Sequence, residues 1–353
     1  MCRGKMINQL LEKLIQRKDL SAAEAYQLMC RIMEGELKES QVAACLVALR
    51  CKGEAVAEVL GSCRAIREYC VKIEPGRKPL VDTCGTGGDY SGSFNISTVS
   101  AFVTAGAGAV VAKHGNRSVS SSSGSADLLE ALGINISLAP GQVLECIERT
   151  GIGFLYAPLL HPAMANAAPA RKALGIRTIF NILGPLNNPA GVTSQVIGVY
   201  DEHLMQIMAE VLRLQEIDHA LLVSGEDGMD ELTNTGPTRI VEVRRGKRFA
   251  YKVCPEDFGL PRVQPRALKS RSAQHSAEIC LQVLSGARGP HRDVVLLNSA
   301  AALYVAGIAE NLHQGMSQAE ASIDEGEALA KLRFLQDYSR ANPLVQQGGV
   351  AYA

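Results

Sequence analysis

The chain has 353 residues, of which 36 are Lys or Arg and 36 are Asp or Glu, so its formal net charge is zero. This balance excludes the basic surplus on which binding to nucleic acid or anionic membranes usually depends. Hydrophobic residues make up 47% and charged residues 20%, a composition that can bury a large core. Aromatic residues are only 5% and Trp is absent, which disfavours a stacking platform for single-stranded nucleic acid.

The ten cysteines are scattered, without a CxxC pair or a Cys/His ligand spacing. We interpret them as small buried apolar residues of a reducing compartment. The N-terminus lacks an apolar signal core, and no apolar run reaches about 18 residues. The sequence therefore predicts a soluble, globular, cytoplasmic protein, and its length favours two domains.

The first 70 residues carry helical patterns only. Apolar residues recur at helical spacing over residues 6–15, and Ser21 with Glu24 forms a capping-box pattern ahead of a helix over 22–33. Two more amphipathic helices are predicted over 41–51 and 55–70. The segment 71–79 contains two prolines and reads as a linker. We therefore expect a small all-helical domain over residues 1–72.

From residue 80 the pattern alternates between strands and helices. Such alternation predicts an α/β domain over residues 73–353, with a mostly parallel central sheet flanked by helices. Segment 239–253 departs from it and predicts an antiparallel hairpin. The expected strands are 80–84, 110–113, 134–136, 152–157, 194–200 and 219–225; the expected helices begin near Ser97 and cover 126–132, 143–150, 202–214, 275–285, 292–308 and 317–337.

A glycine-rich turn follows the first predicted strand. GTGG at 85–88 leads toward a helix that opens near Ser97. Glycines let backbone N–H groups approach an anion, and a helix N-terminus adds donors. The pattern matches neither GxGxxG nor a P-loop, and an ordinary tight turn remains an alternative. The hydroxyls of Ser97 and Thr98, together with Asn95, favour a phosphate site.

Cations and hydroxyls gather after the next predicted strand. Lys113, His114, Asn116 and Arg117 precede a serine-rich stretch. Any one of these side chains alone is more often solvated or structurally bonded. Together, beyond the carboxyl end of a strand, they are suited to a polyphosphate.

Two further segments carry candidate ligands. Asp230 and Glu231 follow another strand, and hard oxygen ligands beside a phosphate site suit Mg²⁺, although such a pair is often only solvent-facing. Segment 161–191 holds Arg171 and Arg177 among small apolar residues. An Arg in such surroundings can grip a carboxylate with two hydrogen bonds, although a surface arginine is the simpler interpretation.

In their order along the chain, these motifs closely resemble the anthranilate phosphoribosyltransferase family. The likeness extends over nearly the whole chain and rests on GTGGD (85–89), NIST (95–98), KHGNR (113–117), SGSAD (123–127), RTIFNILGPLNNP (177–189) and DGMDE (227–231). The resemblance implies a Mg²⁺-dependent transfer of the phosphoribosyl group of phosphoribosyl pyrophosphate (PRPP) to anthranilate, in tryptophan biosynthesis. It also implies a homodimer, two Mg²⁺ per subunit, and a helical domain completed by residues near 166–190, with the active site at the hinge.

The resemblance implies site residues position by position. Anthranilate contacts are expected at Gly85, Asn116 and Arg171, and Mg²⁺ ligands at Ser97, Asp230 and Glu231, with Glu231 bridging two ions. The expected PRPP-binding residues are Gly85, Gly88, Asp89, Ser93, Asn95, Ile96, Ser97, Thr98, Lys113, His114, Gly115, Asn116, Arg117, Ser118, Val119, Ser120, Ser121 and Ser125.

Two positions depart from the family pattern. Ser118 stands where alanine is commoner, and Ser122 stands where a longer, often basic, side chain is usual, so the phosphate loop is expected to carry less positive charge than in most of the family. No residue is expected to act as an acid or base, because an aromatic amine is unprotonated at neutral pH. His114 is expected to orient the loop or contact anthranilate.

Two alternatives share the expected fold. A pyrimidine nucleoside phosphorylase would use free phosphate, which KHGNR and the Asp230–Glu231 pair disfavour. A nucleic-acid-binding relative is disfavoured by the zero net charge and the intact carboxylates.

Overall fold

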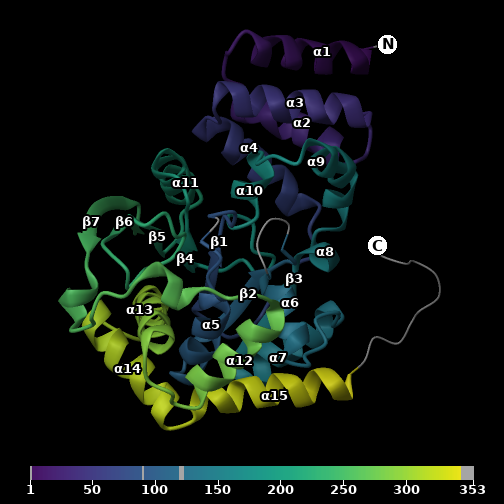
Figure 1. Cartoon of the computed structure of the whole chain (residues 1–353). Coiled ribbons are helices and arrows are strands. Elements are labelled where there is room, and N and C mark those ends of the chain that lie inside the picture. Colours follow the sequence, from purple (N-terminus) through teal and green to yellow (C-terminus); the bar gives the residue numbers. More distant parts are fainter. Residues whose placement is uncertain (1, 90, 119–122, 343–353) are drawn as a thin grey trace.

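A computed structural model describes residues 2–89, 91–118 and 123–342. The N-terminal helices lie on one end of a larger α/β body (Figure 1). They are α1 (Cys2–Ile15), α2 (Ala22–Met33), α3 (Glu39–Lys52) and α4 (Val56–Glu68). The predicted capping box is confirmed, because the Ser21 side chain accepts from the Glu24 N–H and Glu24 accepts from the Ser21 N–H.

Seven strands form one sheet in the order β3-β2-β1-β4-β5-β6-β7. Neighbours from β3 to β5 run parallel, whereas β5–β6 and β6–β7 are antiparallel, so the predicted hairpin is confirmed. The strands are β1 (Leu80–Gly85), β2 (Val110–Gly115), β3 (Ile152–Tyr156), β4 (Ser194–Gly198), β5 (His219–Gly225), β6 (Thr238–Arg244) and β7 (Lys247–Val253).

Helices cover both faces of the sheet, which together with the N-terminal helices confirms the predicted fold class (Figure 1). They are α5 (Ile96–Gly106), α6 (Ser125–Ala131), α7 (Pro140–Thr150), α8 (Ala157–Leu160), α9 (Ala168–Leu174), α10 (Ile179–Leu183), α11 (Glu202–Leu214), α12 (Ala273–Leu284), α13 (Pro290–Val305), α14 (Leu312–Asp324) and α15 (Glu327–Ala341). Short 3₁₀ turns cover Pro162–Ala167, Pro255–Phe258 and Pro265–Leu268. Within the described ranges, no helix has the length and apolar character to cross a membrane.

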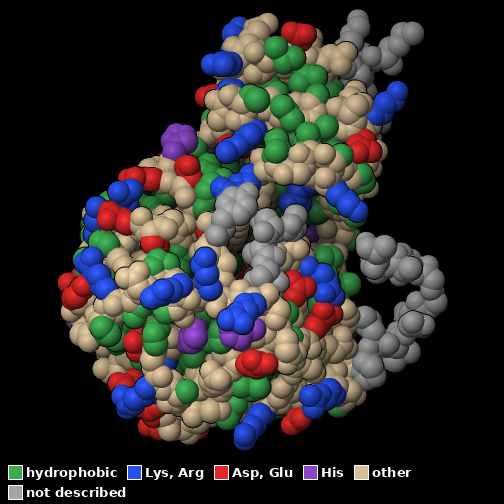
Figure 2. Space-filling model, in the orientation of Figure 1, with side chains coloured by type: hydrophobic (Ala, Val, Ile, Leu, Met, Phe, Trp, Pro, Cys, Tyr) green, Lys and Arg blue, Asp and Glu red, His purple; other side chains and the backbone are tan. Residues whose placement is uncertain are grey.

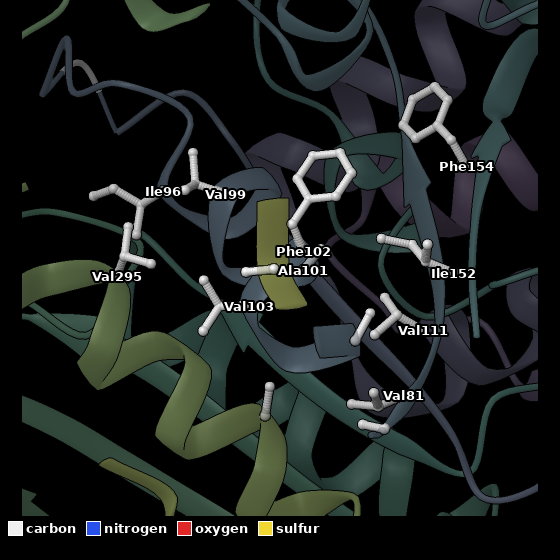
Figure 3. Packing of buried hydrophobic residues seen from close by; sticks show 14 of the residues in the cluster. Val81, Ile96, Val99, Ala101, Phe102, Val103, Val111, Ile152, Phe154 and Val295 are labelled. Atoms are coloured by element: carbon white, nitrogen blue, oxygen red, sulfur yellow. The ribbon is translucent and has the colours of Figure 1, made fainter. Parts of the chain in front are cut away.

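The strands separate two hydrophobic clusters because successive side chains point to opposite faces. Leu221 and Val223 of β5 join the cluster formed with α5, α13 and α15, while Ala220 and Leu222 join the cluster formed with α11 and the N-terminal helices. Figure 3 shows the first cluster, where Phe102 of α5 lies among side chains of the sheet. This arrangement explains why the strands read as continuous apolar runs.

The segment around 166–190 packs against the N-terminal helices. Ala170 of α9 and Phe180 of α10 are buried in the same cluster as side chains of α2, α3 and α4. The Asn166 side chain donates to the Met33 carbonyl at 2.7 Å, and Arg67 of α4 donates to the Leu186 carbonyl at 3.1 Å. This segment lies far from α1–α4 in sequence but shares their core.

Three sequence expectations need correction. Residues 134–136 form no strand; they are an irregular segment whose Ile134 and Ile136 are buried against the core. The expected helix over 317–337 is two helices, α14 and α15, because Gly326 adopts a left-handed conformation (φ 79°) between them. Strand β2 extends beyond residue 113 to Gly115, so His114 and Gly115 belong to the strand rather than to the loop that follows it.

Candidate active site

The candidate site lies where the carboxyl ends of β1, β2 and β4 meet the loop that follows β5. These strands are neighbours in the sheet, and Gly85 at the end of β1 pairs with Gly198 at the end of β4. Ligands of open α/β sheets bind at this edge, beside the point where strand order reverses. The parallel topology therefore brings together the three motifs that follow β1, β2 and β5.

The glycine turn after β1 is in direct contact with the Asp230–Glu231 loop. The N–H of Gly87 donates to Asp230 Oδ2 at 2.9 Å. A Cβ on Gly85 would lie 2.6 Å from that same Oδ2, and a Cβ on Gly198 would lie 1.6 Å from the Asp230 carbonyl oxygen. Gly87 and Gly88 adopt positive φ angles of 65° and 72°, which favour glycine. The glycines thus allow an approach that any side chain would block.

The start of α5 supplies the second part of the site. The Ser97 N–H donates to Glu231 Oε1 at 3.2 Å, so the helix N-terminus faces the acidic loop. The side chain of Asn95, the residue before α5, donates to the Ser123 carbonyl at 3.0 Å and accepts from the Ser123 hydroxyl at 2.7 Å. Ile96 and Thr98 are buried, and the Thr98 hydroxyl lacks a hydrogen-bond partner within the described part of the chain.

Three carboxylates converge opposite this helix start. The Asp230 N–H lies 3.4 Å from Asp89 Oδ2, which places Asp89 beside the Asp230–Glu231 pair. Burial and then the charge of Asp89 hold the pKa of Asp230 well above its ordinary value. Burial raises the pKa of Glu231 to about 8, although Lys113 and Ser97 oppose the shift. Mutual repulsion of these carboxylates creates a demand for a cation.

The donor set fits Mg²⁺. Asp89, Asp230, Glu231 and the Ser97 hydroxyl are hard oxygen ligands, and their repulsion is relieved when a divalent cation binds. Within the described residues, no three His, Cys, Asp or Glu side chains are grouped closely enough to hold a metal by themselves. Mg²⁺ ordinarily takes one or two protein carboxylates and completes its shell with water and substrate phosphate.

Lys113 lies beneath the site, within β2. Its ammonium group donates to the Thr83 carbonyl at 2.5 Å and lies 3.4 Å from Ser97 Oγ. Burial lowers the pKa of Lys113, while Asp82, Cys84 and Glu231 oppose that shift. The side chain therefore places an amino group directly under this edge of the sheet, close to Ser97.

His114 is buried and neutral. Burial, with the neighbouring His161, lowers its pKa to about 3, and burial lowers the pKa of His161 to about 4. The two rings lie 5.1 Å apart between centroids. A histidine with so low a pKa accepts a proton poorly near neutral pH.

The loop after β2 is described only in part. Asn116 Oδ1 accepts from the Arg117 N–H at 2.7 Å, and the Asn116 carbonyl accepts from the Ser125 hydroxyl at 3.3 Å. The Arg117 guanidinium pairs with Asp127 and Glu130 of α6, so it braces the loop. Asp127 also accepts from the Ser118 N–H at 3.0 Å. Val119, Ser120, Ser121 and Ser122 lie outside the described residues.

Gly115 and Ser93 flank these motifs. A Cβ on Gly115 would lie 2.1 Å from Ser125 Oγ, so glycine permits the close contact between β2 and α6. Ser93 Oγ accepts from Ser91 Oγ at 3.1 Å, and the Ser91 N–H donates to Asp89 Oδ1 at 3.1 Å. Asp89, Ser91 and Ser93 therefore form a polar path that leads outward from Asp230 and Glu231, which we call the acidic centre.

Two arginines come from the segment between the helical layer and the sheet. The Arg171 guanidinium lies 5.0 Å from the Phe180 ring centroid, and burial alone lowers the pKa of Arg171. The Arg177 guanidinium lies 3.7 Å from the ring centroid of Tyr200, and a Cβ on Gly88 would lie 3.0 Å from Arg177 Nε. Arg177 thus contacts the glycine turn, whereas Arg171 lies on α9, next to the N-terminal helices.

Sequence reasoning missed Asp82, Asn188 and His161. Asp82 is fully buried in β1, where it accepts from the His114 N–H at 3.1 Å and from Asn188 Nδ2 at 2.8 Å. Asn188 Nδ2 also donates to the Ala112 carbonyl at 2.8 Å, so it joins segment 166–190 to β1 and β2. The signal was a carboxylate inside the apolar run LVDTC, since buried carboxylates need partners.

Comparison with known proteins identifies two matching domains. Residues 8–70 match the helical bundle domain of a glycosyl transferase family, and residues 77–329 match the α/β domain of a glycosyl transferase family. The anthranilate phosphoribosyltransferase of Acetivibrio thermocellus is 48% identical over 336 residues, which cover 95% of this chain and 97% of that protein. The enzyme of the same name from Symbiobacterium thermophilum is 49% identical, covering 94% and 97%.

Solved structures show the same similarity. The crystal structure of anthranilate phosphoribosyltransferase from Thermus thermophilus is 42% identical, with a TM-score of 0.89 and coverage of 94% of this chain and 99% of that chain. The Saccharomyces cerevisiae enzyme, in complex with PRPP and Mg, is 27% identical, with a TM-score of 0.87 and coverage of 95% and 98%. The motifs, the sheet edge that gathers them and these full-length similarities agree: the chain is a glycosyltransferase that belongs to the anthranilate phosphoribosyltransferase family.

Proposed function

We propose that the protein transfers the 5-phosphoribosyl group from PRPP to the amine of anthranilate, with Mg²⁺ and with release of pyrophosphate, in tryptophan biosynthesis. The observation that carries this proposal is the convergence of the GTGG turn, the α5 N-terminus, Lys113 and three carboxylates at one sheet edge. A complex of the yeast relative with PRPP and Mg supports the substrate and the cation.

Asp230, Glu231 and Ser97 would hold Mg²⁺, two ions per subunit, with Asp89 nearby. Bound Mg²⁺ would neutralise charge on the departing pyrophosphate. The positive end of the α5 dipole would favour phosphate oxygens at this edge, and Lys113 would add a buried positive charge beneath them. The residues expected from the sequence would line this phosphate site: Gly85, Gly88, Asp89, Ser93, Asn95, Ile96, Ser97, Thr98, Lys113, His114, Gly115, Asn116, Arg117, Ser118, Val119, Ser120, Ser121 and Ser125.

Anthranilate would be held from the other side of the site. Arg171 lacks a counter-charge that shifts its pKa, so a substrate carboxylate would be a favourable partner for it. Asn116 and Gly85 would complete this contact. The amine is already unprotonated, so positioning against the anomeric carbon supplies much of the rate enhancement without a general base.

We further propose the domain division and assembly. The helical domain would comprise residues 1–72 and the segment near 166–190, and the α/β domain residues 73–353, with the substrates bound between them. The hydrogen bonds from Asn166 to the Met33 carbonyl and from Arg67 to the Leu186 carbonyl support the assignment of this segment to the helical domain. We also propose a homodimer in the cytoplasm, as the family resemblance implies.

Loss of anthranilate fluorescence on addition of PRPP and Mg²⁺ tests the activity. We expect fluorescence loss only when both are present, and one pyrophosphate released per anthranilate consumed. Replacement of Asp230→Asn with Glu231→Gln should abolish turnover at all practical Mg²⁺ levels and leave circular dichroism unchanged. The proposal would be contradicted if the parent enzyme did not consume anthranilate with PRPP and Mg²⁺ but cleaved a pyrimidine nucleoside with phosphate.

A further inference from the structure

A short segment between β7 and α12 lies against the glycine-rich side of the site. The Phe94 N–H donates to the Leu268 carbonyl at 3.0 Å, and the Ser270 N–H donates to the Gly92 carbonyl at 2.8 Å. These two bonds flank Ser93 and Lys269, which form an antiparallel bridge. In such a pair the two side chains project from the same face, with Cβ atoms about 4.5–5.5 Å apart. Lys269 therefore projects beside Ser93.

Three cationic side chains emerge from this segment. Arg266, Lys269 and Arg271 are exposed, and no ion pair joins them to a carboxylate in the described part of the chain, whereas nearby Arg262 pairs with Glu256. In Figure 1 the segment leading into α12 crosses the front of the larger body, and Figure 2 shows Lys, Arg and His side chains there. We call Arg266, Lys269 and Arg271 the cationic rim.

The backbone beneath the rim is firmly held. Leu268 is fully buried, and the Ser276 hydroxyl donates to Ser270 Oγ at 2.9 Å. The ring of Phe94 meets the ring of His291 edge-on, with centroids 5.0 Å apart. The Arg271 N–H donates to His275 Nδ1 at 3.3 Å. The rim is thus a fixed source of positive charge, although the long side chains themselves extend into solvent.

A polar path leads from the rim to the acidic centre. Lys269 faces Ser93, Ser93 contacts Ser91, Ser91 donates to Asp89, and Asp89 lies beside Asp230. The molecule has no net charge, so its total charge does not attract a polyanion, and any attraction must come from a local cluster of cations such as the rim. Local fields of this kind raise the association rate of oppositely charged ligands by about 10- to 1000-fold and weaken with salt.

We propose that the cationic rim captures the polyphosphate substrate at the edge of the site and raises its rate of association. This inference rests on the proposed function, because PRPP is the polyanion that the rim would attract. The rim acts through its charge and outside the buried phosphate site. Its contribution should therefore be large at low ionic strength and nearly absent when the Debye length falls to about 3–4 Å.

The test varies PRPP at a saturating concentration of anthranilate, at 20 mM and at 500 mM salt. We expect Lys269→Gln with Arg271→Gln to lower kcat/KM for PRPP about fivefold at low salt and less than about twofold at high salt. The kcat value and the KM for anthranilate should stay unchanged. Lys269→Arg, which keeps the charge, should retain the parent kcat/KM.

A control with the same change in net charge is Lys247→Gln with Arg333→Gln. Lys247 lies at the β6–β7 turn, at the far edge of the sheet, and Arg333 lies on α15; both are exposed. This pair should change kcat/KM for PRPP by less than about twofold at either salt concentration. Any of three results would overturn the proposed role of the rim. These are an unchanged kcat/KM for PRPP in the rim variant, a decrease of equal size at both salt concentrations, or an equal decrease in the control variant. An inactive parent enzyme would instead overturn the proposed function.

Discussion

Arg171 shows how a single residue acquires a role through its surroundings. It lies over the Phe180 ring, and burial lowers its pKa because the guanidinium is partly removed from water. A planar carboxylate can accept two parallel hydrogen bonds from a guanidinium, whereas an ammonium group fixes it less well.

We expect Arg171→Ala to raise the KM for anthranilate by about 10- to 150-fold, which corresponds to about 1.5–3 kcal/mol for one charge-assisted bond. The KM for PRPP should change little, and Arg171→Lys should recover part of the loss. Steady-state kinetics with each substrate varied separately measures both constants. The exposed neighbour Lys172→Ala is the control, and a flat result for Arg171→Ala would mean that Asn116 and the loop backbone hold anthranilate alone.

The histidine pair makes a second prediction at the residue scale. His114 and His161 have folded-state pKa values of about 3 and about 4, below the ordinary value of 6.5. Between these values the unfolded chain binds protons that the folded chain does not, so folding stability falls as pH falls below about 6.5. At pH 5 each histidine should cost about 2 kcal/mol of the stability present above pH 7.

Chemical denaturation at pH 7.5 and pH 5 measures this effect. We expect His161→Gln to be less stable than the parent at pH 7.5 but to lose about 2 kcal/mol less between the two pH values. His203→Gln, on the exposed start of α11, is the control and should leave the pH dependence as in the parent. An identical loss in the His161 variant and the parent would show that these rings are protonated in the folded protein.

At the scale of elements, the close approach of β1, β4 and the acidic loop depends on glycine. Gly198 ends β4, and a Cβ there would lie 1.6 Å from the Asp230 carbonyl oxygen. That atom belongs to the backbone, so no rotation of a side chain can relieve the clash. The loop itself is fixed, because the Leu232 N–H donates to the buried Asn298 Oδ1 at 3.1 Å.

Gly198→Ala should therefore displace the Asp230–Glu231 loop, reduce activity at least about tenfold and cost about 1–3 kcal/mol of stability. Raised Mg²⁺ should restore part of the activity if the carboxylates still point into the site. Gly236→Ala is the matched control, since a Cβ at Gly236 has no atom within 4 Å. Thermal unfolding and turnover at several Mg²⁺ concentrations test this prediction. Unfolding temperatures and turnover equal to those of the parent in both variants would refute the steric argument.

At the scale of the whole molecule, segment 166–190 connects the two layers. Its α9 and α10 share a core with α2–α4, whereas Asn188 hydrogen bonds to β1 and β2. Arg177 of the same segment lies against Gly88. The candidate site therefore lies between the two layers, and a change in their relative position would alter the distance from Arg171 to the sheet edge formed by β1, β2 and β4.

The sequence by itself determined the element types and the fold class. Capping at Ser21, strand–helix alternation from residue 80 and the hairpin at 239–253 are local patterns, and the structure contains them. The element bounds predicted from local patterns were wrong at two places. Ile134 and Ile136 look like a strand but have no neighbouring strand to pair with, and Gly326 divides a helix that its apolar spacing made continuous.

Only the tertiary structure decided which distant groups meet. Sequence order cannot reveal that Asp82 accepts from the His114 N–H, that the His161 ring lies next to the His114 ring, or that Lys269 faces Ser93. Each pair is joined through strand register or packing rather than through neighbouring positions. The motifs identified the chemistry that the chain carries. Their distances, their burial and the resulting pKa shifts follow from the sheet order, which brings the ends of β1, β2 and β4 and the loop after β5 to one edge.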